Sequence, residues 1–375
     1  MANVYILIIA FMVAIIMGRI IIPKILIISF RKRLFDVPDA RKVHNRPIPR
    51  LGGVTFFPVI VFTLTLVTAF RVMMNEIHYE VFTHKMACEF LFLVAGLTLL
   101  YIVGIGDDLV GVRYSKKFLV QIISAAFFPI VGLYINNFYG VFGINEIPAW
   151  IGMPFTVVLV VFITNAINLI DGIDGLASGL SMVALAIFGG IFIHYGLWNF
   201  AILAFICVGV IIPFFAYNVF GNADRGRKIF MGDTGSLTLG YIISFFVVKY
   251  CMYIPGEDMQ AYGAPVVVAF AVLLVPCLDV VRVFLRRIRN GKSPFLPDKT
   301  HIHHKFLDMG FTPRTALITI QLMSAAFCIF SLVAVKYLDN TLVFIIDIVV
   351  WVGLNIWFNK RIAKRKALTT NGQQS

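Results

Sequence analysis

Charged residues are scarce in this sequence, and acidic residues are the scarcest. Of its 375 residues only 14% are charged, with 19 Asp and Glu against 32 Lys and Arg, whereas 60% are hydrophobic. A soluble globular domain has about 25% charged residues, so this chain has too little polar surface to cover a water-facing protein of its size. The composition therefore excludes a soluble enzyme and a disordered chain, and it favours a polytopic membrane protein.

Cysteine is also rare, and the five cysteines show no C-x-x-C or other metal-binding spacing. This excludes a small secreted protein held together by disulfides. We interpret the cysteines as small apolar residues in or near membrane spans, and nothing in the sequence supports a Cys88–Cys251 disulfide. The five are Cys88, Cys207, Cys251, Cys277 and Cys328.

Long apolar runs recur along the whole chain, without internal repeats, low-complexity tracts or a soluble domain. A hydrocarbon core about 30 Å thick requires roughly 20 apolar residues per helix. We therefore predict an all-α polytopic membrane protein, in which residues 1–360 form one transmembrane domain and residues 361–375 a basic cytoplasmic tail. The eleven predicted spans are at about 3–23, 54–70, 90–106, 118–135, 151–170, 176–193, 198–220, 234–250, 265–285, 315–335 and 341–359.

The basic residues predict the orientation, because Lys and Arg are retained on the cytoplasmic side of a membrane. Arg71, Lys85, Lys249 and Lys336 fall in loops on one face, Arg19 lies within the first span, and every other Lys and Arg falls on the opposite face. The N-terminus is therefore expected in the periplasm and the C-terminus in the cytoplasm. The first span lacks a preceding basic region, which favours an uncleaved anchor over a signal peptide.

The few acidic residues gather at the predicted cytoplasmic ends of spans. Asp107 and Asp108 follow the third span, Asp171 and Asp174 follow the fifth, and Asp233 opens the eighth. Carboxylates at membrane depth are costly and usually functional. Three glycine-rich loops on one face thus predict a common site, although each carboxylate alone could be a helix cap or part of a plain loop.

The local settings of these carboxylates require a positive charge nearby. Asp107 and Asp108 lie at the C-terminal end of a predicted helix, where the helix dipole is negative. Two carboxylates there are unfavourable unless a basic group such as Lys116 or Lys117 neutralises them. Asp171 and Asp174 are three residues apart, so one helical turn would place both on the same face. We interpret Asp347, well inside the last span, as a buried helix-contact carboxylate without a catalytic role.

Two further motifs complete the predicted cytoplasmic site. The Gly232-Asp233-Thr234-Gly235-Ser236 turn leads into a helix N-terminus, where free N–H groups can bind an anion and Asp233 can hold a metal. His301-Ile302-His303-His304 lies in a basic loop. Because the other candidate ligands are hard carboxylates, Mg²⁺ or Mn²⁺ is favoured over Zn²⁺, and the histidines are expected to hydrogen-bond phosphate.

Carboxylates that hold Mg²⁺, together with basic groups that hold phosphates, indicate phosphoryl transfer. A site at the membrane boundary favours one lipid phosphate and one soluble nucleotide as substrates. A cation-coupled transporter is the non-enzyme alternative, and it would place its acids near mid-span instead. A lipid-binding protein such as a scramblase would not need the magnesium site. Nothing indicates a nucleic acid as partner.

The motifs resemble those of the polyprenyl-phosphate N-acetylhexosamine-1-phosphate transferase family. Members of this family fold as bundles of ten or eleven helices with an active site on the cytoplasmic side, and the resemblance implies the same fold here. The matching segments are residues 36–44, 49–53, 106–108, 168–175, 230–236 and 301–304, in the family's order.

The resemblance implies transfer of a sugar 1-phosphate from a UDP-sugar to undecaprenyl phosphate, with release of UMP, in the inner (plasma) membrane. The His-Ile-His-His motif and the Arg41-Lys42-Val43-His44 segment look like the GlcNAc-1-phosphate branch, which starts a lipid-linked cell-envelope glycan. The branch that uses UDP-MurNAc-pentapeptide usually has Pro-Thr-Met-Gly-Gly where this chain has Pro49-Arg50-Leu51-Gly52-Gly53. UDP-GlcNAc is therefore favoured, with another UDP-N-acetylhexosamine or UDP-MurNAc-pentapeptide as alternatives.

The resemblance also implies roles for individual residues. Asp233 would be the principal ligand of Mg²⁺, for which Mn²⁺ can substitute, and Asp107 the candidate general base. The implied catalytic residues are Asp107, Asp108, Asp171, His303 and His304. The implied substrate-binding residues are Lys117, Asn168, Asp174, Asn218, Phe230, His301, Arg41, Lys42 and His44. The expected partners are undecaprenyl phosphate, the UDP-sugar, the lipid bilayer and a second copy of the chain in a homodimer.

Overall fold

The computed structural model describes residues 2–35, 48–74, 84–252, 264–291, 293 and 300–372. Over these ranges the regular structure is helical, apart from a single antiparallel bridge between Asn137 and Glu146. A membrane-spanning chain must satisfy its backbone N–H and C=O groups internally, and a helix does so within one segment. The elements are α1 (Ala2–Lys32), η1 (Gly52–Thr55), α2 (Phe56–Met73), α3 (His84–Val110), α4 (Tyr114–Ile130), η2 (Val141–Gly143), α5 (Ala149–Ile170), α6 (Leu176–His194), α7 (Trp198–Val219), α8 (Gly232–Cys251), α9 (Pro265–Arg289), α10 (Ile302–Asp308), α11 (Pro313–Ala334) and α12 (Asn340–Gly372).

The described residues contain ten helices that are long and apolar enough to cross a membrane, so the prediction of an all-α polytopic membrane protein is confirmed. Each of the eleven predicted spans corresponds to a helix. The predicted span at about 118–135 is α4, whose 17 residues are at the lower limit for crossing the hydrocarbon core. The five cysteines are free thiols, and four of them are buried, whereas Cys88 is exposed.

The chain divides into two compact units. The first comprises the described parts of Met1–Asn136, Ile147–Asp171 and Ala177–Met252, and the second comprises those of Asn137–Glu146, Gly172–Leu176 and Tyr253–Ser375. Helix α12 continues through residue 360 as far as Gly372, so the first basic residues assigned to a tail belong to this helix. The division into a domain and a tail stays a prediction.

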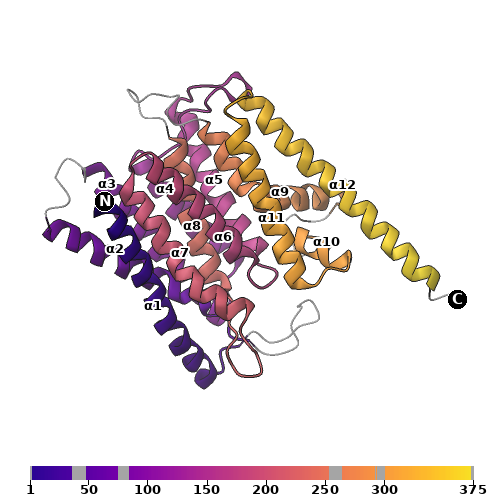
Figure 1. Ribbon diagram of the computed structural model, residues 1–375, viewed down its shortest axis with the longest axis horizontal. Coiled ribbons are helices and arrows are strands. Elements are labelled where there is room, and N and C mark those ends of the chain that lie inside the picture. The colour runs from indigo at the N-terminus through magenta and orange to yellow at the C-terminus, as the bar shows by residue number, and fades with distance from the viewer. Residues whose placement is uncertain are drawn as a thin grey trace. The chain divides into compact units, whose positions relative to one another are not determined.

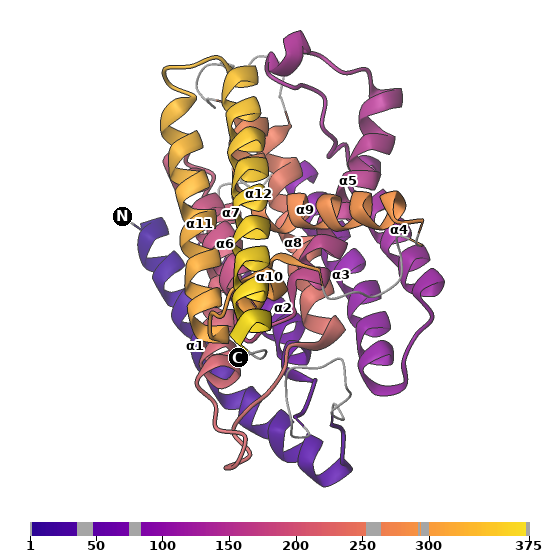
Figure 2. The same ribbon diagram turned by 90° about the vertical axis from the view of Figure 1, so that its right-hand side faces the viewer.

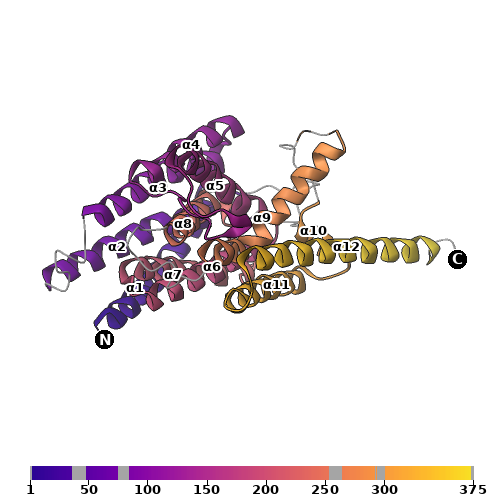
Figure 3. The same cartoon turned by 90° about the horizontal axis from the view of Figure 1, so that it is seen from above.

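Helix α8 forms the centre of the first unit. It is almost entirely buried and packs against α3 and α5, while α4 packs on the outer side of both of these helices (Figure 3). Small residues permit this close packing, since Gly240 of α8 lies directly against the backbone of Thr164 in α5. The hydroxyl groups of Thr238 and Ser244 donate to carbonyls one turn earlier in α8, so they add no unpaired polar group to the core.

Helices α3 and α8 run antiparallel and are joined by charged groups at both ends. At one end, Lys249 of α8 donates to both carboxylate oxygens of the buried Glu89 of α3, at 2.9 and 3.0 Å, and its ammonium group lies over the Phe200 ring. At the other end, the carboxylate of Asp108 in α3 binds the first turn of α8. These two sets of contacts fix the position of α3 along α8, and so they place the carboxylates at the end of α3 next to the start of α8.

Three further helices, α1, α2 and α7, pack side by side in the first unit (Figure 1). Arg71, near the end of α2, ties them together by donating to Asn3 of α1 and Asn199 of α7. Helix α6 contacts α7 and α8 through aromatic rings, including those of Phe188 and Phe192. Some of the many phenylalanines therefore form the core of this unit.

The second unit contains α9 to α12. Helix α11 packs against α9 and α12 (Figure 2), and the short helix α10 contacts α11 and α12. A small hydrophobic cluster that includes Val141, Val267 and Val343 joins η2 to these helices. Asp347 of α12 is fully buried and accepts a hydrogen bond from Ser331 of α11 at 2.7 Å, which confirms its interpretation as a helix-contact carboxylate.

Candidate active site

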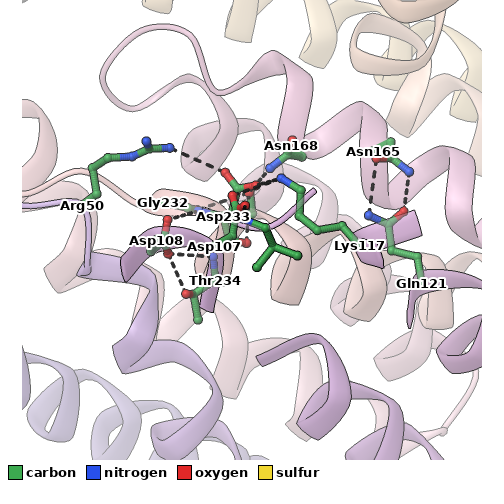
Figure 4. A network of polar contacts seen from close by, with 12 residues as sticks. Arg50, Asp107, Asp108, Lys117, Gln121, Asn165, Asn168, Gly232, Asp233 and Thr234 are labelled. Carbon is green, nitrogen blue, oxygen red and sulfur yellow. Dashed lines mark hydrogen bonds and ion pairs between the residues drawn. The ribbon is translucent and has the colours of Figure 1, made fainter. Parts of the chain in front are cut away.

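The carboxylates at the ends of α3 and α8 converge on one lysine (Figure 4). Asp107 lies in the last turn of α3, Asp233 lies in the first turn of α8, and Lys117 lies in the first turn of α4. The Lys117 ammonium donates to Asp107 at 3.0 Å and to Asp233 at 2.6 Å. Lys117 thus supplies the positive charge that the sequence required, whereas the neighbouring Lys116 side chain is exposed.

The three side chains of this cluster are largely shielded from solvent, with exposed fractions of 15% for Asp107, 22% for Lys117 and 14% for Asp233. The two carboxylates raise the pKa of Lys117, because their charges and hydrogen bonds outweigh the opposing effect of burial. Lys117 therefore carries a positive charge throughout the neutral range. Lys117 thus balances part of the negative charge of Asp107 and Asp233.

Asp108 has a different role from its neighbour. One of its oxygens accepts the Asp233 backbone N–H at 2.8 Å, and the other accepts the Thr234 N–H at 3.0 Å and the Thr234 hydroxyl at 2.6 Å. Exposed N–H groups and the helix dipole make a helix N-terminus a binding site for an anion. The predicted anion site at the start of α8 therefore exists, and the anion that it binds is the carboxylate of Asp108.

Two glycines make this arrangement sterically feasible. Gly232 has a φ of +74° and faces the Asp108 carboxylate, a backbone conformation that a side chain would strain. Gly104 of α3 lies against the backbone of Thr234, where a Cβ atom would come within 2.6 Å of the threonine Cα. The close approach of α3 to the first turn of α8 therefore depends on glycine on both sides.

A short backbone ladder adds a guanidinium group to the cluster. The Phe230 N–H donates to the Pro49 carbonyl, and the Gly52 and Gly53 N–H groups donate to the carbonyls of Phe230 and Met231, at 2.7–2.9 Å. This pairing joins two of the sequence motifs. It places the Arg50 guanidinium 3.6 Å from Asp233, on the more exposed side of the cluster.

Amide side chains extend the polar region along α4 and α5. Asn168 of α5 donates to Ser236 of α8 at 2.8 Å. One turn deeper, Gln121 of α4 and Asn165 of α5 exchange two hydrogen bonds (Figure 4). Gln121 is one turn from Lys117, so this amide pair fixes the spacing between the lysine and Asn168.

The donor set fits Mg²⁺. The described residues contain no group of three or more His, Cys, Asp and Glu side chains arranged to hold a metal ion. However, Mg²⁺ is commonly bound by only one or two carboxylates, with substrate phosphates and waters as the other ligands. Asp107 and Asp233 form such a pair, because they already share one cation, the Lys117 ammonium.

The histidine motif belongs to the second unit, where a buried carboxylate of α9 holds it. Asp279 accepts hydrogen bonds from the Ile302 N–H, at 3.0 and 3.1 Å to its two oxygens, and it pairs with His301 Nδ1 at 2.9 Å. Arg282 bridges Asp279 to the Thr300 carbonyl. The motif is therefore anchored at its first residues.

Two buried groups next to this anchor have altered protonation. Burial, reinforced by the neighbouring histidines, lowers the pKa of His303 to about 3, so this ring is neutral at physiological pH. Its Nδ1 atom is buried and has no hydrogen-bond partner among the described residues. Burial also lowers the pKa of Lys305 to about 8, and its ammonium group donates to Asn355 at 2.8 Å.

Comparison with known proteins identifies the family. The profile of glycosyl transferase family 4 matches residues 90–251, which extend from α3 to α8. The "Probable undecaprenyl-phosphate N-acetylglucosaminyl 1-phosphate transferase" of Bacillus subtilis (strain 168) is 32% identical over 91% of this chain and 89% of its own length. Two proteins named "Undecaprenyl-phosphate alpha-N-acetylglucosaminyl 1-phosphate transferase" are also 32% identical. The Yersinia pestis protein matches over 80% of this chain and 76% of its own length, and the Escherichia coli (strain K12) protein over 78% and 74%.

The chain belongs to glycosyl transferase family 4. This membership confirms the resemblance noted from the motifs.

The structure brings five of the predicted site residues of this family member into one network in the first unit. They are Asp107, Asp108, Lys117, Asn168 and Asp233. In the second unit, Gly172 belongs to the turn that contains Asp174 (the Asp174 turn) and lies against the His303 ring. A Cβ atom on Gly172 would overlap this ring. His301 and His303 are buried and stack in parallel, and His304 follows at a tilt.

Other predicted residues are placed differently. The prediction that Asp171 and Asp174 share one face of a helical turn is wrong, because α5 ends at Ile170 and residues 171–175 form a non-helical turn. Asp171 is exposed at this helix end. Asn218 is buried and donates to the Ile229 carbonyl at 2.8 Å, so it shapes the loop before half-buried Phe230. Arg41, Lys42 and His44 lie outside the described residues.

Several residues of these networks were not predicted to be functional. Asp279 lies within an apolar run and was not predicted to be functional, although it is an isolated acid three residues before Arg282 and seven before Arg286. Thr234 and Ser236 belong to the Gly232–Ser236 motif, but the sequence predicted no role for their side chains. Gln121 and Asn165 could have been found as polar residues on facing positions of two apolar helices, since such residues usually pair.

Proposed function

We propose that this protein is a Mg²⁺-dependent transferase that moves GlcNAc 1-phosphate from UDP-GlcNAc to undecaprenyl phosphate and releases UMP. The observation that carries the proposal is the convergence of Asp107, Asp233 and Lys117 at the ends of three apolar helices. The names of the relatives, each an undecaprenyl-phosphate N-acetylglucosaminyl 1-phosphate transferase, support the choice of substrates. The product would begin a lipid-linked glycan of the cell envelope.

The cluster provides what a diphosphate substrate needs. Asp107 and Asp233 would hold Mg²⁺, which neutralises charge on the diphosphate as UMP leaves. Lys117 and Arg50 supply positive charge beside the same carboxylates and would bind phosphate oxygens. Asn168, one helix away, would donate an amide hydrogen bond to the substrate. We assign the histidines of the second unit to hydrogen bonds with phosphate or sugar oxygens.

The hydrogen bonds of the two adjacent aspartates favour direct transfer over a covalent intermediate. Both oxygens of Asp108 accept hydrogen bonds from the start of α8, and both oxygens of Asp107 accept from Lys117 or the Val112 N–H. Carboxylates engaged in this way are weak nucleophiles. We therefore propose that an oxygen of the lipid phosphate attacks the β-phosphorus of UDP-GlcNAc, and that the bond from this phosphorus to the UMP oxygen breaks.

As a ligand of Mg²⁺ whose two oxygens also accept hydrogen bonds, Asp107 would contribute little as a general base. The second pKa of a phosphate monoester is about 6, so the lipid phosphate is mostly dianionic at pH 7. Little proton removal is then required, and positioning provides most of the catalysis. The alternative is an aspartyl-phosphate intermediate on Asp107 or Asp108. Rapid quenching with UDP-GlcNAc but without lipid acceptor tests this, because a covalent phospho-sugar adduct would contradict direct transfer.

The substrate assay uses purified protein in detergent with undecaprenyl phosphate, and with UDP-GlcNAc, a second UDP-N-acetylhexosamine or UDP-MurNAc-pentapeptide offered separately. Label from UDP-GlcNAc alone is expected in the lipid phase. EDTA should abolish transfer, and Mg²⁺ or Mn²⁺ should restore it. Asp233→Asn should be inactive, whereas Asp339→Asn, which changes an aspartate in the turn before α12, should retain activity. Transfer from only the pentapeptide substrate would overturn the sugar assignment.

We further propose an inner-membrane location with the carboxylate cluster on the cytoplasmic side, as the distribution of Lys and Arg predicts. Cysteine labelling tests this orientation. A cysteine at Lys116 should react with a membrane-impermeant maleimide only after the membrane is opened, and a cysteine at Tyr337 should react in spheroplasts. Light scattering of the purified protein tests the expected homodimer.

A further inference from the structure

Asp279 is a fully buried carboxylate that contacts the histidine motif and Arg282. It lies in α9, and its oxygens accept from the Ile302 N–H and from Arg282, while one of them pairs with His301 Nδ1 at 2.9 Å. The Arg282 guanidinium, 2.6 Å from Asp279, favours its charged carboxylate form. A carboxylate accepts hydrogen bonds and cannot donate them.

This pairing determines where His301 carries its proton. Because Asp279 can only accept, Nδ1 of His301 must be the donor, in both the neutral and the charged ring. The other ring nitrogen, Nε2, is then the one atom of His301 at which protonation can change. A carboxylate that orients a histidine in this way is a recurrent device in enzyme sites, where its removal leaves the ring in the wrong tautomer.

The effect of Asp279 extends to the next histidine. His301 and His303 stack with an interplanar angle of 1° and a centroid separation of 5.9 Å, and the His303 ring lies against Gly172 of the Asp174 turn. A change in the orientation of His301 would therefore press on the His303 ring. His303 has no room to adjust, since it is buried and a single Cβ atom at Gly172 would already overlap it.

We propose that Asp279 is a positioning residue that holds His301 in the Nδ1–H tautomer and so presents Nε2 as its functional nitrogen. The inference rests on the proposed transferase function, in which the histidines bind phosphate or sugar oxygens. Asp279 itself is fully buried and acts on the reaction through His301. It follows that the part of its effect on the reaction that passes through His301 should disappear when His301 is absent.

The first part of the experiment is spectroscopic and does not depend on activity. Protein labelled with [¹⁵N]histidine is recorded in long-range ¹H–¹⁵N spectra, and the His301 signals are assigned from their loss in His301→Gln. The wild-type ring should show a protonated Nδ1. In Asp279→Asn the side-chain amide can donate to Nδ1, so the ring should shift toward the Nε2–H tautomer. An Nε2–H tautomer in the wild type would overturn the proposal, even if Asp279→Asn does not fold.

The second part is a kinetic cycle. Asp279→Asn should lower kcat for GlcNAc 1-phosphate transfer about 10- to 100-fold, the usual effect of losing a partner that orients a histidine, with a smaller change in KM. The double variant Asp279→Asn/His301→Gln should be no slower than His301→Gln alone. Multiplied effects of the two changes would indicate a merely structural role and contradict the proposal. Asp347→Asn, which removes an equally buried carboxylate from the same unit, should leave kcat unchanged.

The two parts separate the inference from the function on which it rests. Wild-type protein without transferase activity would refute the proposed function, and the tautomer measurement would still decide what Asp279 does to His301. Active wild-type protein together with an unchanged kcat and an unchanged tautomer in Asp279→Asn would refute the inference and leave the function intact.

Discussion

The Asp108→Asn substitution is expected to damage the fold, whereas the same change at Asp233 is expected to damage only the chemistry. The Asp108 carboxylate binds the first turn of α8 through two N–H groups and the Thr234 hydroxyl, at 2.6–3.0 Å. An asparagine keeps one acceptor oxygen but loses the charge. Its NH₂ group would face the backbone N–H of Asp233 or Thr234, which cannot accept a hydrogen bond.

The expected magnitude follows from these contacts. A hydrogen bond to a charged group contributes about 1.5–3 kcal/mol, and a charge at a partly buried helix end contributes up to about 2 kcal/mol. Because the replacement retains part of this interaction, we expect Asp108→Asn to lower the free energy of unfolding by about 3 kcal/mol. Asp233 instead faces Lys117 and Arg50, and Lys117 keeps Asp107 as a partner. An asparagine oxygen can still accept from Lys117, so this replacement should lower that free energy by less than the change at Asp108, about 1–1.5 kcal/mol for one hydrogen bond.

The assay is SDS-induced unfolding in mixed micelles, combined with transferase activity measured below the unfolding transition. A double-mutant cycle with Thr234→Val isolates the hydroxyl contact, for which we expect a coupling energy of about 1–2 kcal/mol. Both aspartate variants should lose activity, and Asp108→Asn alone should lose substantial stability. An Asp108→Asn protein as stable as the wild type would refute the assignment of this carboxylate as the cap of α8.

Three further predictions test the surroundings of the site. Lys117→Met removes the cation shared by Asp107 and Asp233, and it should reduce transfer at least about 100-fold in the lipid-extraction assay, as expected for a group that stabilises phosphoryl charge; a reduction below threefold would contradict the cluster's role. His303 is neutral in the folded protein because its pKa is about 3. An unfolded histidine has a pKa near 6.5 and binds a proton as the pH falls below that value. The free energy of unfolding should therefore be about 2 kcal/mol lower at pH 5 than at pH 8. This loss should disappear in His303→Gln, and an unchanged pH dependence would show that His303 is not its source. Gln121→Leu alone leaves the Asn165 side-chain oxygen without its donor, while the Asn165 NH₂ group keeps the Val161 carbonyl. This change should lower stability by about 1–3 kcal/mol, whereas the double variant with Asn165→Leu should be more stable than either single variant in the same unfolding assay.

Much of the fold could be predicted because the membrane imposes a simple rule on sequence. Each apolar run long enough to cross a bilayer formed a helix, and the shortest, α4, was found although it has only 17 residues. The convergence of Asp107 and Asp233 was also predictable, since both are costly charges at the same predicted face. Their counter-charge, Lys117, was one of two adjacent lysines, and the sequence alone could not choose between them.

The details that were missed depend on how helices approach one another. Asp108 caps α8 only because Gly104 lets α3 lie against Thr234, and no local pattern reports such a contact. Asp279 was hidden within an apolar run, because its partners are 3 to 23 residues away and become neighbours only in the fold. The i, i+3 spacing of Asp171 and Asp174 was misleading because α5 ends at Ile170 and the chain then forms a turn, in which Gly175 has a positive φ.

The most direct test of the central claim follows the β-phosphate of the donor. Purified protein is incubated with UDP-GlcNAc labelled with ³²P in its β-phosphate, undecaprenyl phosphate and Mg²⁺, with Asp233→Asn as the inactive control. Our account predicts that the label enters the lipid phase together with the sugar and that unlabelled UMP is released. If the sugar reaches the lipid while the label stays in UDP, the protein transfers a sugar and not a sugar phosphate, and the account is wrong.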